Sequence, residues 1–272
     1  MNLEALFRDK PLIAALMGVH ALTIVVGLLW AATRRKGFGN FGILLLLAAF
    51  GINTAILATS WSAAGRAPIK TLYETLLLYP WCVALVTMLL LAMYRLKILI
   101  PFSAVVSLAG LVYAVMKPDV EILNLPPALQ SFWFIPHVVT YFVAYAGLFA
   151  SFKLAILALV KSDWRSERSG FGFEQYAHRA AMFGFAALTL GIVMGAIWGK
   201  EAWGDYWGWD PKENWALVTF LVYLAYLHLR LVRGWQGTPA MVVLLVSFAA
   251  VVFTYLGMSL LPSAGGSLHV YQ

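Results

Sequence analysis

The sequence has little charge and a single cysteine, and each shortage excludes a class of protein. Charged residues make up 11% of the 272 residues and hydrophobic residues 62%, whereas soluble domains are about a quarter charged. This composition excludes a water-soluble globule and indicates a chain embedded in a lipid bilayer. Cys82 is the only cysteine and lies in an apolar run. An internal disulfide and a CxxC redox pair are therefore excluded, and we expect Cys82 to be a packing residue.

The net charge of +7 is not arranged for binding nucleic acid. Lys and Arg are scattered over short loops between apolar segments, whereas nucleic-acid-binding proteins concentrate basic residues on one face. Nucleic acid is therefore excluded as a partner.

Apolar segments of the length that a bilayer-spanning helix needs, about 20 residues, recur along the whole chain. They predict eight spans, at residues 11–32, 40–60, 72–94, 98–116, 133–160, 177–198, 212–231 and 239–261. Segment 98–116 is the weakest of these, because it is short and contains Pro101 near its start. Since short loops join all the spans, we expect residues 1–272 to form one all-α membrane domain, a polytopic helical bundle.

The basic residues of the loops predict how the spans are oriented, because cytoplasmic loops are enriched in Lys and Arg. One set of alternate loops, which includes residues 34–36, 95–97 and 161–179, is richer in them. Assigning that set to the cytoplasm places both termini outside, together with loops 61–71, 117–132 and 199–211. Residues 34–36 also flank the first span like a stop-transfer signal, so we expect this span to be retained rather than cleaved.

Five of the eleven tryptophans fall between Trp198 and Trp215. An aromatic belt at the membrane surface spreads its tryptophans over all span ends, whereas these are concentrated in one outer segment. Glycines interleave with them and allow close approach of the backbone. We therefore predict a flat apolar surface for a planar ligand over the outer loop 198–215. Its residues are Trp198, Trp203, Tyr206, Trp207, Trp209, Asp210 and Trp215.

Two short motifs that contain acidic residues indicate the starts of helices. Asp210 fits an N-cap, with Pro211 as the first helical residue and Glu213 as the third. The positive end of that helix would favour an anionic group such as a haem propionate, so capping and ligand contact both stay open for Asp210 and Glu213. Glu74 follows Thr71 at the spacing of a capping box. Arg66, shortly before, is either a propionate partner or a structural loop charge.

Two histidines are predicted on the same outer face as the tryptophans. His137 begins a span, with Tyr141 and Tyr145 on the same helix face, and His269 follows the last span. Imidazole is a common axial ligand of haem iron. A planar aromatic surface flanked by two imidazoles suits a six-coordinate haem, and we predict His137 and His269 as its axial ligands.

The other three histidines differ in setting. His228 lies about 25 Å deeper than the Asp210 cap at 1.5 Å per residue, near the cytoplasmic end. It is either an interfacial polar residue or a ligand at an inner site, and its place in a span favours function. His20 lies in the middle of the first span and is either structural or a partner ligand. His178 is expected to be solvated in a cytoplasmic loop.

The segment from Trp203 to Trp215 resembles the tryptophan-rich "WWD" signature of haem-handling membrane proteins. Its Asp-Pro-Lys-Glu continuation at residues 210–213 resembles the CcsA/ResC family, a subunit of System II cytochrome c synthases, rather than CcmC-type proteins. The resemblance covers most of the chain from residue 61 onward, including Gly65-Arg66-Ala67-Pro68, Leu72-Tyr73-Glu74, His137, Tyr226-Leu227-His228 and the tail around His269.

The resemblance implies a function and roles for three histidines. His137 and His269 match the outer-face histidines that coordinate haem, and His228 matches a transmembrane histidine of a second haem site. The implied activity is that of a haem lyase subunit, with haem b as bound substrate, apocytochrome c as acceptor and a ResB/CcsB-type subunit as partner. The implied location is the bacterial cytoplasmic membrane or the thylakoid, with the site on the outer face. No role for His20 and no catalytic acid or base is implied.

Three alternatives remain open from the sequence. A HemX-like protein carries the same signature but regulates haem synthesis. An electron-transfer cytochrome b requires two histidines at matched depth on facing spans, whereas His137 and His269 lie at span ends. A haem transporter requires broken helices and polar residues at the membrane midplane, of which the sequence has few.

Overall fold

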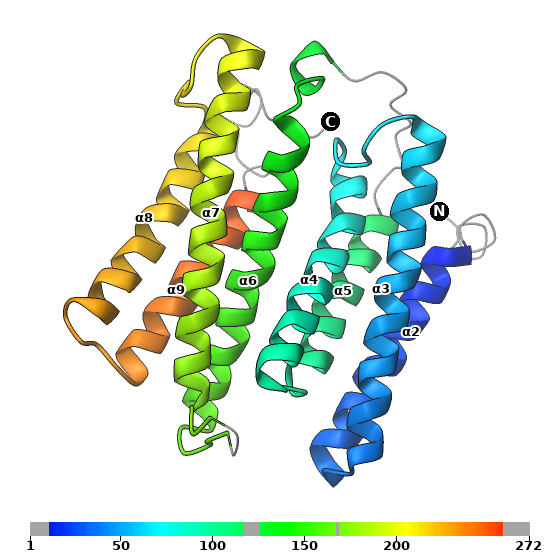
Figure 1. Ribbon diagram of the computed structural model, residues 1–272, viewed down its shortest axis with the longest axis vertical. Coiled ribbons are helices and arrows are strands. Elements are labelled where there is room, and N and C mark those ends of the chain that lie inside the picture. Colours follow the sequence, from blue (N-terminus) through cyan, green and yellow to red (C-terminus); the bar gives the residue numbers. More distant parts are fainter. Residues whose placement is uncertain (1–10, 117–125, 167–168, 258–272) are drawn as a thin grey trace. The chain divides into compact units, whose positions relative to one another are not determined.

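The computed structural model describes residues 11–116, 126–166 and 169–257, and the regular structure within them is helical (Figure 1). Each of the eight predicted spans corresponds to one helix, so the predicted all-α fold is confirmed. The elements are α2 (Pro11–Thr33), α3 (Lys36–Ala64), α4 (Leu72–Tyr94), α5 (Leu99–Val115), the short 3-10 helix η1 (Pro127–Leu129), α6 (Phe134–Val160), α7 (Phe173–Trp203), α8 (Pro211–Leu231) and α9 (Thr238–Tyr255).

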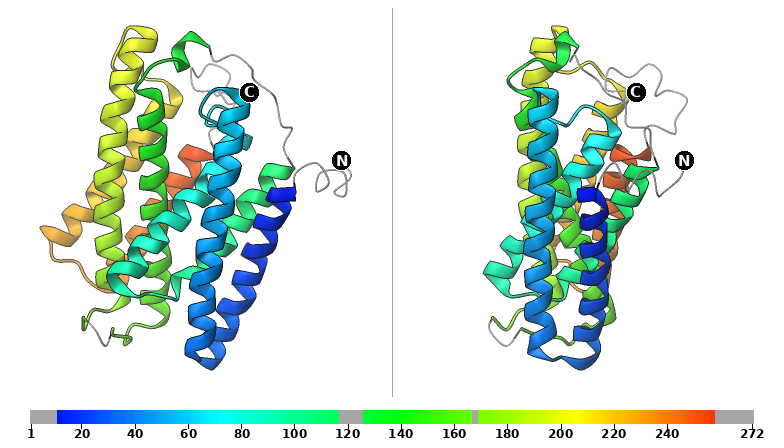
Figure 2. Two further views of the ribbon diagram at one scale, coloured as in Figure 1. Left: turned by 45° about the vertical axis from the view of Figure 1, so that its right-hand side comes forward. Right: turned by 90° about the vertical axis from the view of Figure 1, so that its right-hand side faces the viewer.

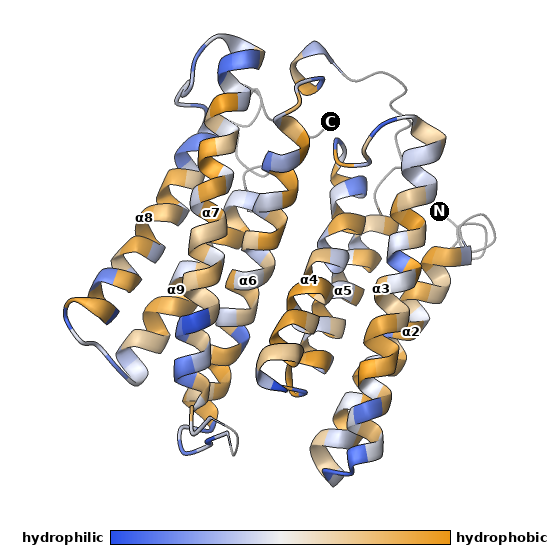
Figure 3. Ribbon diagram, in the orientation of Figure 1, coloured by the Kyte–Doolittle hydropathy of each residue, from blue (hydrophilic) through white to orange (hydrophobic). Residues whose placement is uncertain are grey.

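Among the described residues, seven helices are long and apolar enough to cross a bilayer, as expected of an integral membrane protein. Helix α5 has 17 residues, which is about 25 Å at 1.5 Å per residue. The segment with the weakest span pattern is therefore a helix, but one shorter than the hydrocarbon core of about 30 Å. Hydrophobic residues cover the helices, and hydrophilic residues gather toward helix ends and connections (Figure 3). The predicted orientation of the termini stays a prediction.

The chain divides into two compact units, residues 1–124 and 125–272, and the expectation of a single domain stays a prediction. In the first unit α2 lies beside α3, and α5 packs against both α2 and α4 (Figure 2). A hydrogen bond of 2.7 Å joins the Thr87 hydroxyl of α4 to that of Ser103 of α5. Leu46, Ala84 and Ile100 form a buried apolar cluster. Cys82 is fully buried and free, which confirms its predicted packing role.

In the second unit α6 packs most extensively against α7 and also against α9, while α8 packs mainly against α9. Phe152 of α6 stacks on Phe248 of α9 with ring centroids 4.6 Å apart. A hydrogen bond of 2.8 Å between the Thr219 and Thr254 hydroxyls joins α8 to α9. This arrangement fixes the two helices, α7 and α8, that carry the Trp-rich segment.

Candidate functional site

The Trp-rich segment is less of a loop than the sequence predicts. Helix α7 continues through Trp203 and ends at Gly204, which adopts a φ of 91°. The Lys200 carbonyl of α7 accepts a hydrogen bond of 3.1 Å from the Gly204 N–H. The apolar run ends near Trp198, but polar residues that tolerate helix carry the helix further until a glycine accepts the left-handed turn. Trp198 and Trp203 are therefore helical, and residues 204–210 alone connect α7 to α8.

The predicted cap at the start of α8 is confirmed. A carboxylate oxygen of Asp210 accepts from the Lys212 N–H at 2.8 Å. One oxygen of Glu213 accepts from the Asp210 N–H at 3.1 Å and from the Gly208 N–H at 2.9 Å. Both carboxylates therefore hold backbone N–H groups of the connection in place. Ligand contact by Asp210 stays a prediction.

Two aromatic side chains of the connection are exposed, Tyr206 at 61% and Trp209 at 68%. Trp209 adopts a φ of 56°, an uncommon conformation for a large residue. Asn214 fixes this turn, because its side-chain amide donates to the Trp209 carbonyl at 3.0 Å. Trp207 meets Trp209 edge to face with centroids 6.2 Å apart. The exposed rings of Tyr206 and Trp209 are accessible, and the flat ligand surface stays a prediction.

Two buried polar atoms lie beside these aromatic residues. Within the described part of the chain, the indole nitrogen of Trp207 and the side-chain oxygen of Asn214 have no hydrogen-bond partner. Buried polar atoms are normally paired. A donor and an acceptor thus lie at this connection in addition to its aromatic faces.

Trp198 differs from the exposed tryptophans because it is 3% exposed. Its indole N–H donates to the Ala128 carbonyl at 2.7 Å, and its ring meets that of Trp203 at 4.7 Å. Trp215, also predicted for the platform, packs on Phe253 of α9 at 4.1 Å. Trp198 therefore packs inside the helix bundle and presents little surface to a ligand.

His137, in the first turn of α6, lies against Trp198. The two rings stack with centroids 5.5 Å apart at 29°, and Tyr141 meets the imidazole edge to face at 4.9 Å. The Nδ1 atom lies 2.9 Å from the Gly191 carbonyl of α7. A carbonyl only accepts, so Nδ1 carries the hydrogen and Nε2 carries the lone pair. Metal-ligating histidines commonly show this arrangement.

The second predicted axial ligand, His269, lies outside the described residues, and its role stays a prediction. Within residues 11–116, 126–166 and 169–257, no group of three or more His, Cys, Asp or Glu is placed to hold a bare metal ion. Haem needs no such group, since the porphyrin supplies four ligands and the protein only the axial ones. The assignment of His137 as an axial ligand of haem iron stays a prediction.

His228 lies in the last turn of α8 and is exposed. Its neighbour Tyr226 contacts His178 of α7, whereas His137 contacts Gly191 of the same helix. These two α7 positions are about 20 Å apart at 1.5 Å per residue. His137 and His228 therefore lie far apart along the second unit, and the ligand role of His228 stays a prediction.

Arg66 and Glu74, of the first unit, pair with each other. Their side chains form two hydrogen bonds, of 2.8 and 3.2 Å, and are 9% and 14% exposed. Glu74 also accepts from the Lys70 and Thr71 N–H groups at 2.7 and 3.0 Å, completing the predicted capping box. Of the two readings left open for this pair, these contacts support the structural one.

The remaining histidines are both inside helices. His20 is 3% exposed in α2. The prediction of a solvated His178 in a loop is wrong, because α7 already begins at Phe173 and His178 is half-buried, with Nδ1 3.2 Å from the Tyr226 hydroxyl. The early start has a local cause, since the side chain of Gln175 accepts from the Gly172 N–H at 2.8 Å.

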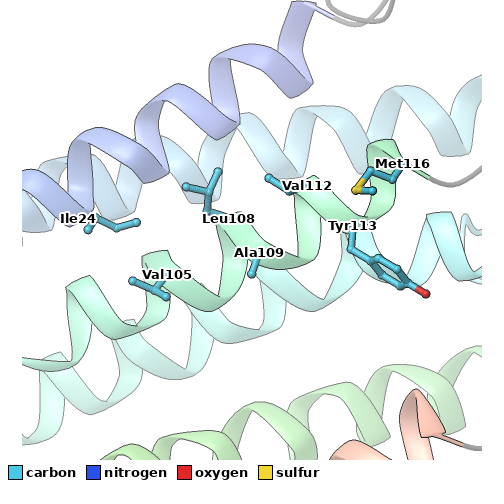
Figure 4. Close-up of a pocket in the computed structure, with 7 residues that line it drawn as sticks. All are labelled: Ile24, Val105, Leu108, Ala109, Val112, Tyr113 and Met116. Carbon is cyan, nitrogen blue, oxygen red and sulfur yellow. The ribbon is translucent and has the colours of Figure 1, made fainter. Parts of the chain in front are cut away.

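A shallow apolar groove runs along α2 and α5 of the first unit (Figure 4). Its lining is almost entirely apolar and includes none of the predicted site residues. Its lining residues are Ile24, Val105, Leu108, Ala109, Val112, Tyr113 and Met116.

Known proteins are similar to this chain in sequence or in fold. The family model described as "Cytochrome C assembly protein" matches residues 69–264. The cytochrome c biogenesis protein CcsA of Chlamydomonas reinhardtii is 35% identical over 269 residues, which cover 94% of this chain and 72% of that protein. CcsA of Prochlorococcus marinus (strain MIT 9215) is 31% identical and is covered to 98%.

A solved structure titled "Cytochrome c Heme Lyase CcmF" superposes with a TM-score of 0.70 at 18% identity. The match covers 90% of this chain but 45% of that protein, so the likeness concerns the fold. Since the family model covers most of the sequence, from the end of the 61–71 segment to beyond α9, this chain belongs to the cytochrome C assembly protein family.

Proposed function

We propose that the chain binds haem b at the α7–α8 connection and presents it for covalent attachment to apocytochrome c, as a haem lyase subunit. Its family gives the general role, cytochrome c biogenesis. The observation that carries the proposal is His137, whose Nδ1 is held by the Gly191 carbonyl at 2.9 Å. That contact leaves Nε2 as the atom that ligates iron.

The aromatic residues of the connection hold the haem plane. Tyr206 and Trp209 are exposed, and Trp207 brings an indole N–H that no acceptor among the described residues satisfies. A propionate oxygen is a suitable acceptor for this N–H. The positive end of α8, which begins at Pro211, favours the same negative charge.

In the proposed reaction each reduced thiol of the acceptor CxxCH segment adds to one haem vinyl group. A sulfur–carbon bond forms at the inner vinyl carbon and the thiol proton goes to the outer one, so iron and sulfur keep their oxidation states. His137 and His269 occupy the axial positions of the iron until the acceptor histidine displaces one of them. The chain supplies positioning, worth several kcal/mol in well-oriented reactions.

A ResB/CcsB-type membrane subunit completes the proposal at the inner end. His228 is exposed on α8, near the exposed apolar side chains Leu221 and Leu224. An ionisable side chain facing lipid is unfavourable. We infer that a helix of the partner covers His228 and that haem passes this position on its way to the outer site.

Co-expression of the chain with a ResB-type partner and an apocytochrome c tests the proposal. Covalent haem on the denatured acceptor is the readout, and His137→Ala is expected to abolish it. His178→Ala removes a histidine of the same unit at the far end of α7 and serves as control. A complex that carries haem but never yields thioether product contradicts the lyase role and leaves a HemX-like regulator or a haem transporter.

A further inference from the structure

We propose that Gly195 and Gly191 of α7 are positioning residues that set the place and the tautomer of the His137 imidazole. The proposal rests on the proposed function, since it takes His137 as a ligand of haem iron. It assigns roles to two residues that the sequence prediction does not include. Their spacing of one helical turn is a signal for close helix contact, and it places both on the same face of α7.

Gly195 leaves the space that the imidazole fills. A Cβ atom added at Gly195 would lie 2.5 Å from Cε1 of His137 and 2.8 Å from its Nδ1. Both distances are shorter than real contacts of a Cβ atom. Any side chain at this position therefore displaces the ring.

The imidazole has little room to move away. Trp198 stacks on it at 5.5 Å, and Trp198 is itself fixed by its hydrogen bond to the Ala128 carbonyl. Tyr141 contacts the imidazole edge to face, with ring centroids 4.9 Å apart. A methyl group at Gly195 would therefore change the orientation of the imidazole rather than be absorbed by a small shift.

Gly191 acts on the same ring in two ways. Its carbonyl oxygen lies 2.9 Å from Nδ1 and accepts its hydrogen, which keeps the lone pair on Nε2 and raises the basicity of Nε2 toward iron. A Cβ atom on Gly191 would lie 2.6 Å from Cδ2 of Tyr141, so the missing side chain lets Tyr141 support the imidazole. Loss of either effect weakens His137 as a ligand.

Close packing of α6 on α7 is the competing explanation for these glycines, and Gly184 separates the two. A Cβ atom on Gly184 would lie 2.6 Å from Leu148 of α6, so this glycine serves the same helix pair. It lies about 16 Å from Gly195 along α7 at 1.5 Å per residue. Gly184→Ala therefore perturbs the helix contact without touching His137.

The experiment compares Gly195→Ala, Gly184→Ala and His137→Ala in the full chain purified with its ResB-type partner. Haem content and the absorption spectrum of the bound haem are measured, with and without added imidazole. We expect Gly195→Ala to retain haem about tenfold more weakly, the lower end for outer-shell changes, with a spectrum shifted toward that of His137→Ala. Added imidazole is expected to restore the wild-type spectrum in Gly195→Ala and in His137→Ala. Gly184→Ala is expected to show the wild-type spectrum with and without imidazole.

A double variant makes the test specific, because removal of the ring also removes the clash. Gly195→Ala added to His137→Ala is expected to cause no further loss of haem, whereas independent effects would add.

The positioning role is overturned if Gly184→Ala and Gly195→Ala shift the haem spectrum alike, or if the double variant loses more haem than His137→Ala. If His137→Ala leaves the spectrum unchanged, the proposed ligand itself is wrong. If His137→Ala shifts it and Gly195→Ala does not, the positioning role alone fails.

Discussion

The ring of Trp198 stacks on the imidazole of His137, with centroids 5.5 Å apart and 29° between the planes. The tryptophan comes from α7 and the histidine from α6, so the contact joins the two most extensively packed helices of the second unit. Because Trp198 is 3% exposed, its contribution to haem binding is expected to be support of the ligand.

Substitution of Trp198 tests that support. Trp198→Phe keeps an aromatic ring but removes the hydrogen bond to Ala128, so the free energy of unfolding should fall by about 1 kcal/mol with the haem spectrum retained. Trp198→Ala should cost roughly 3–5 kcal/mol and shift the spectrum. Thermal unfolding in detergent measures the stability of both variants, and absorption spectra report on their bound haem.

Trp209→Ala, at a 68% exposed position, should lower haem content with no loss of stability. A loss of stability with unchanged haem content would contradict this assignment.

Asp210 offers a test that separates capping from ligand contact. Asp210→Ala removes the acceptor for the Lys212 N–H and should cost about 1 kcal/mol of stability. Asp210→Ser restores a capping oxygen without the charge. If capping is the role, the serine variant regains both stability and haem content. Recovery of stability without recovery of haem would instead assign Asp210 to the ligand.

Arg66 and Glu74 are expected to act on stability alone. Either alanine substitution leaves a largely buried charge without its ion-pair partner, at a cost of roughly 1.5–3 kcal/mol. The double substitution should destabilise by less than the sum of the two, because it removes both charges together. Thermal unfolding of the wild type, the two single variants and the double variant gives the coupling free energy between the two side chains. A haem spectrum that changes in folded Arg66→Ala would contradict the structural role and favour a propionate contact.

Glu174 and Arg230 form an ion pair that ties the start of α7 to the end of α8. Glu174 also accepts from the Gly237 N–H at 3.0 Å, and Arg230 donates to the Trp235 carbonyl at 2.8 Å. Because the guanidinium serves two acceptors, Arg230→Lys should replace it poorly. Both Arg230→Lys and Glu174→Gln are expected to lower the unfolding temperature and to leave the His137-dependent haem spectrum intact. Retained stability in either variant would contradict this role.

The sequence predicts the helices better than it predicts the site, and the reasons are physical. Hydropathy marks where an apolar run ends, but a helix ends where a residue such as Gly204 or Gly172 changes the backbone, so the limits of α7 are longer than predicted. Local motifs such as the Asp210 cap are confirmed because their partners are close in sequence. The contact of Gly195 with His137 depends on the register between α6 and α7, which no local pattern encodes.

His228 gives a prediction that depends on the partner. In the chain purified alone, His228→Ala should leave haem content unchanged, because its side chain is exposed and the proposed inner site needs a second ligand from the ResB-type subunit. In the complex, the same substitution should lower haem content and the yield of covalent product. Leu224→Ala, 43% exposed in the wild type on the same helix, controls for loss of bulk on α8. Since the ligand and not the surface area is proposed to matter, Leu224→Ala should retain haem in both preparations, and an equal loss in the two variants would assign this face of α8 to packing alone.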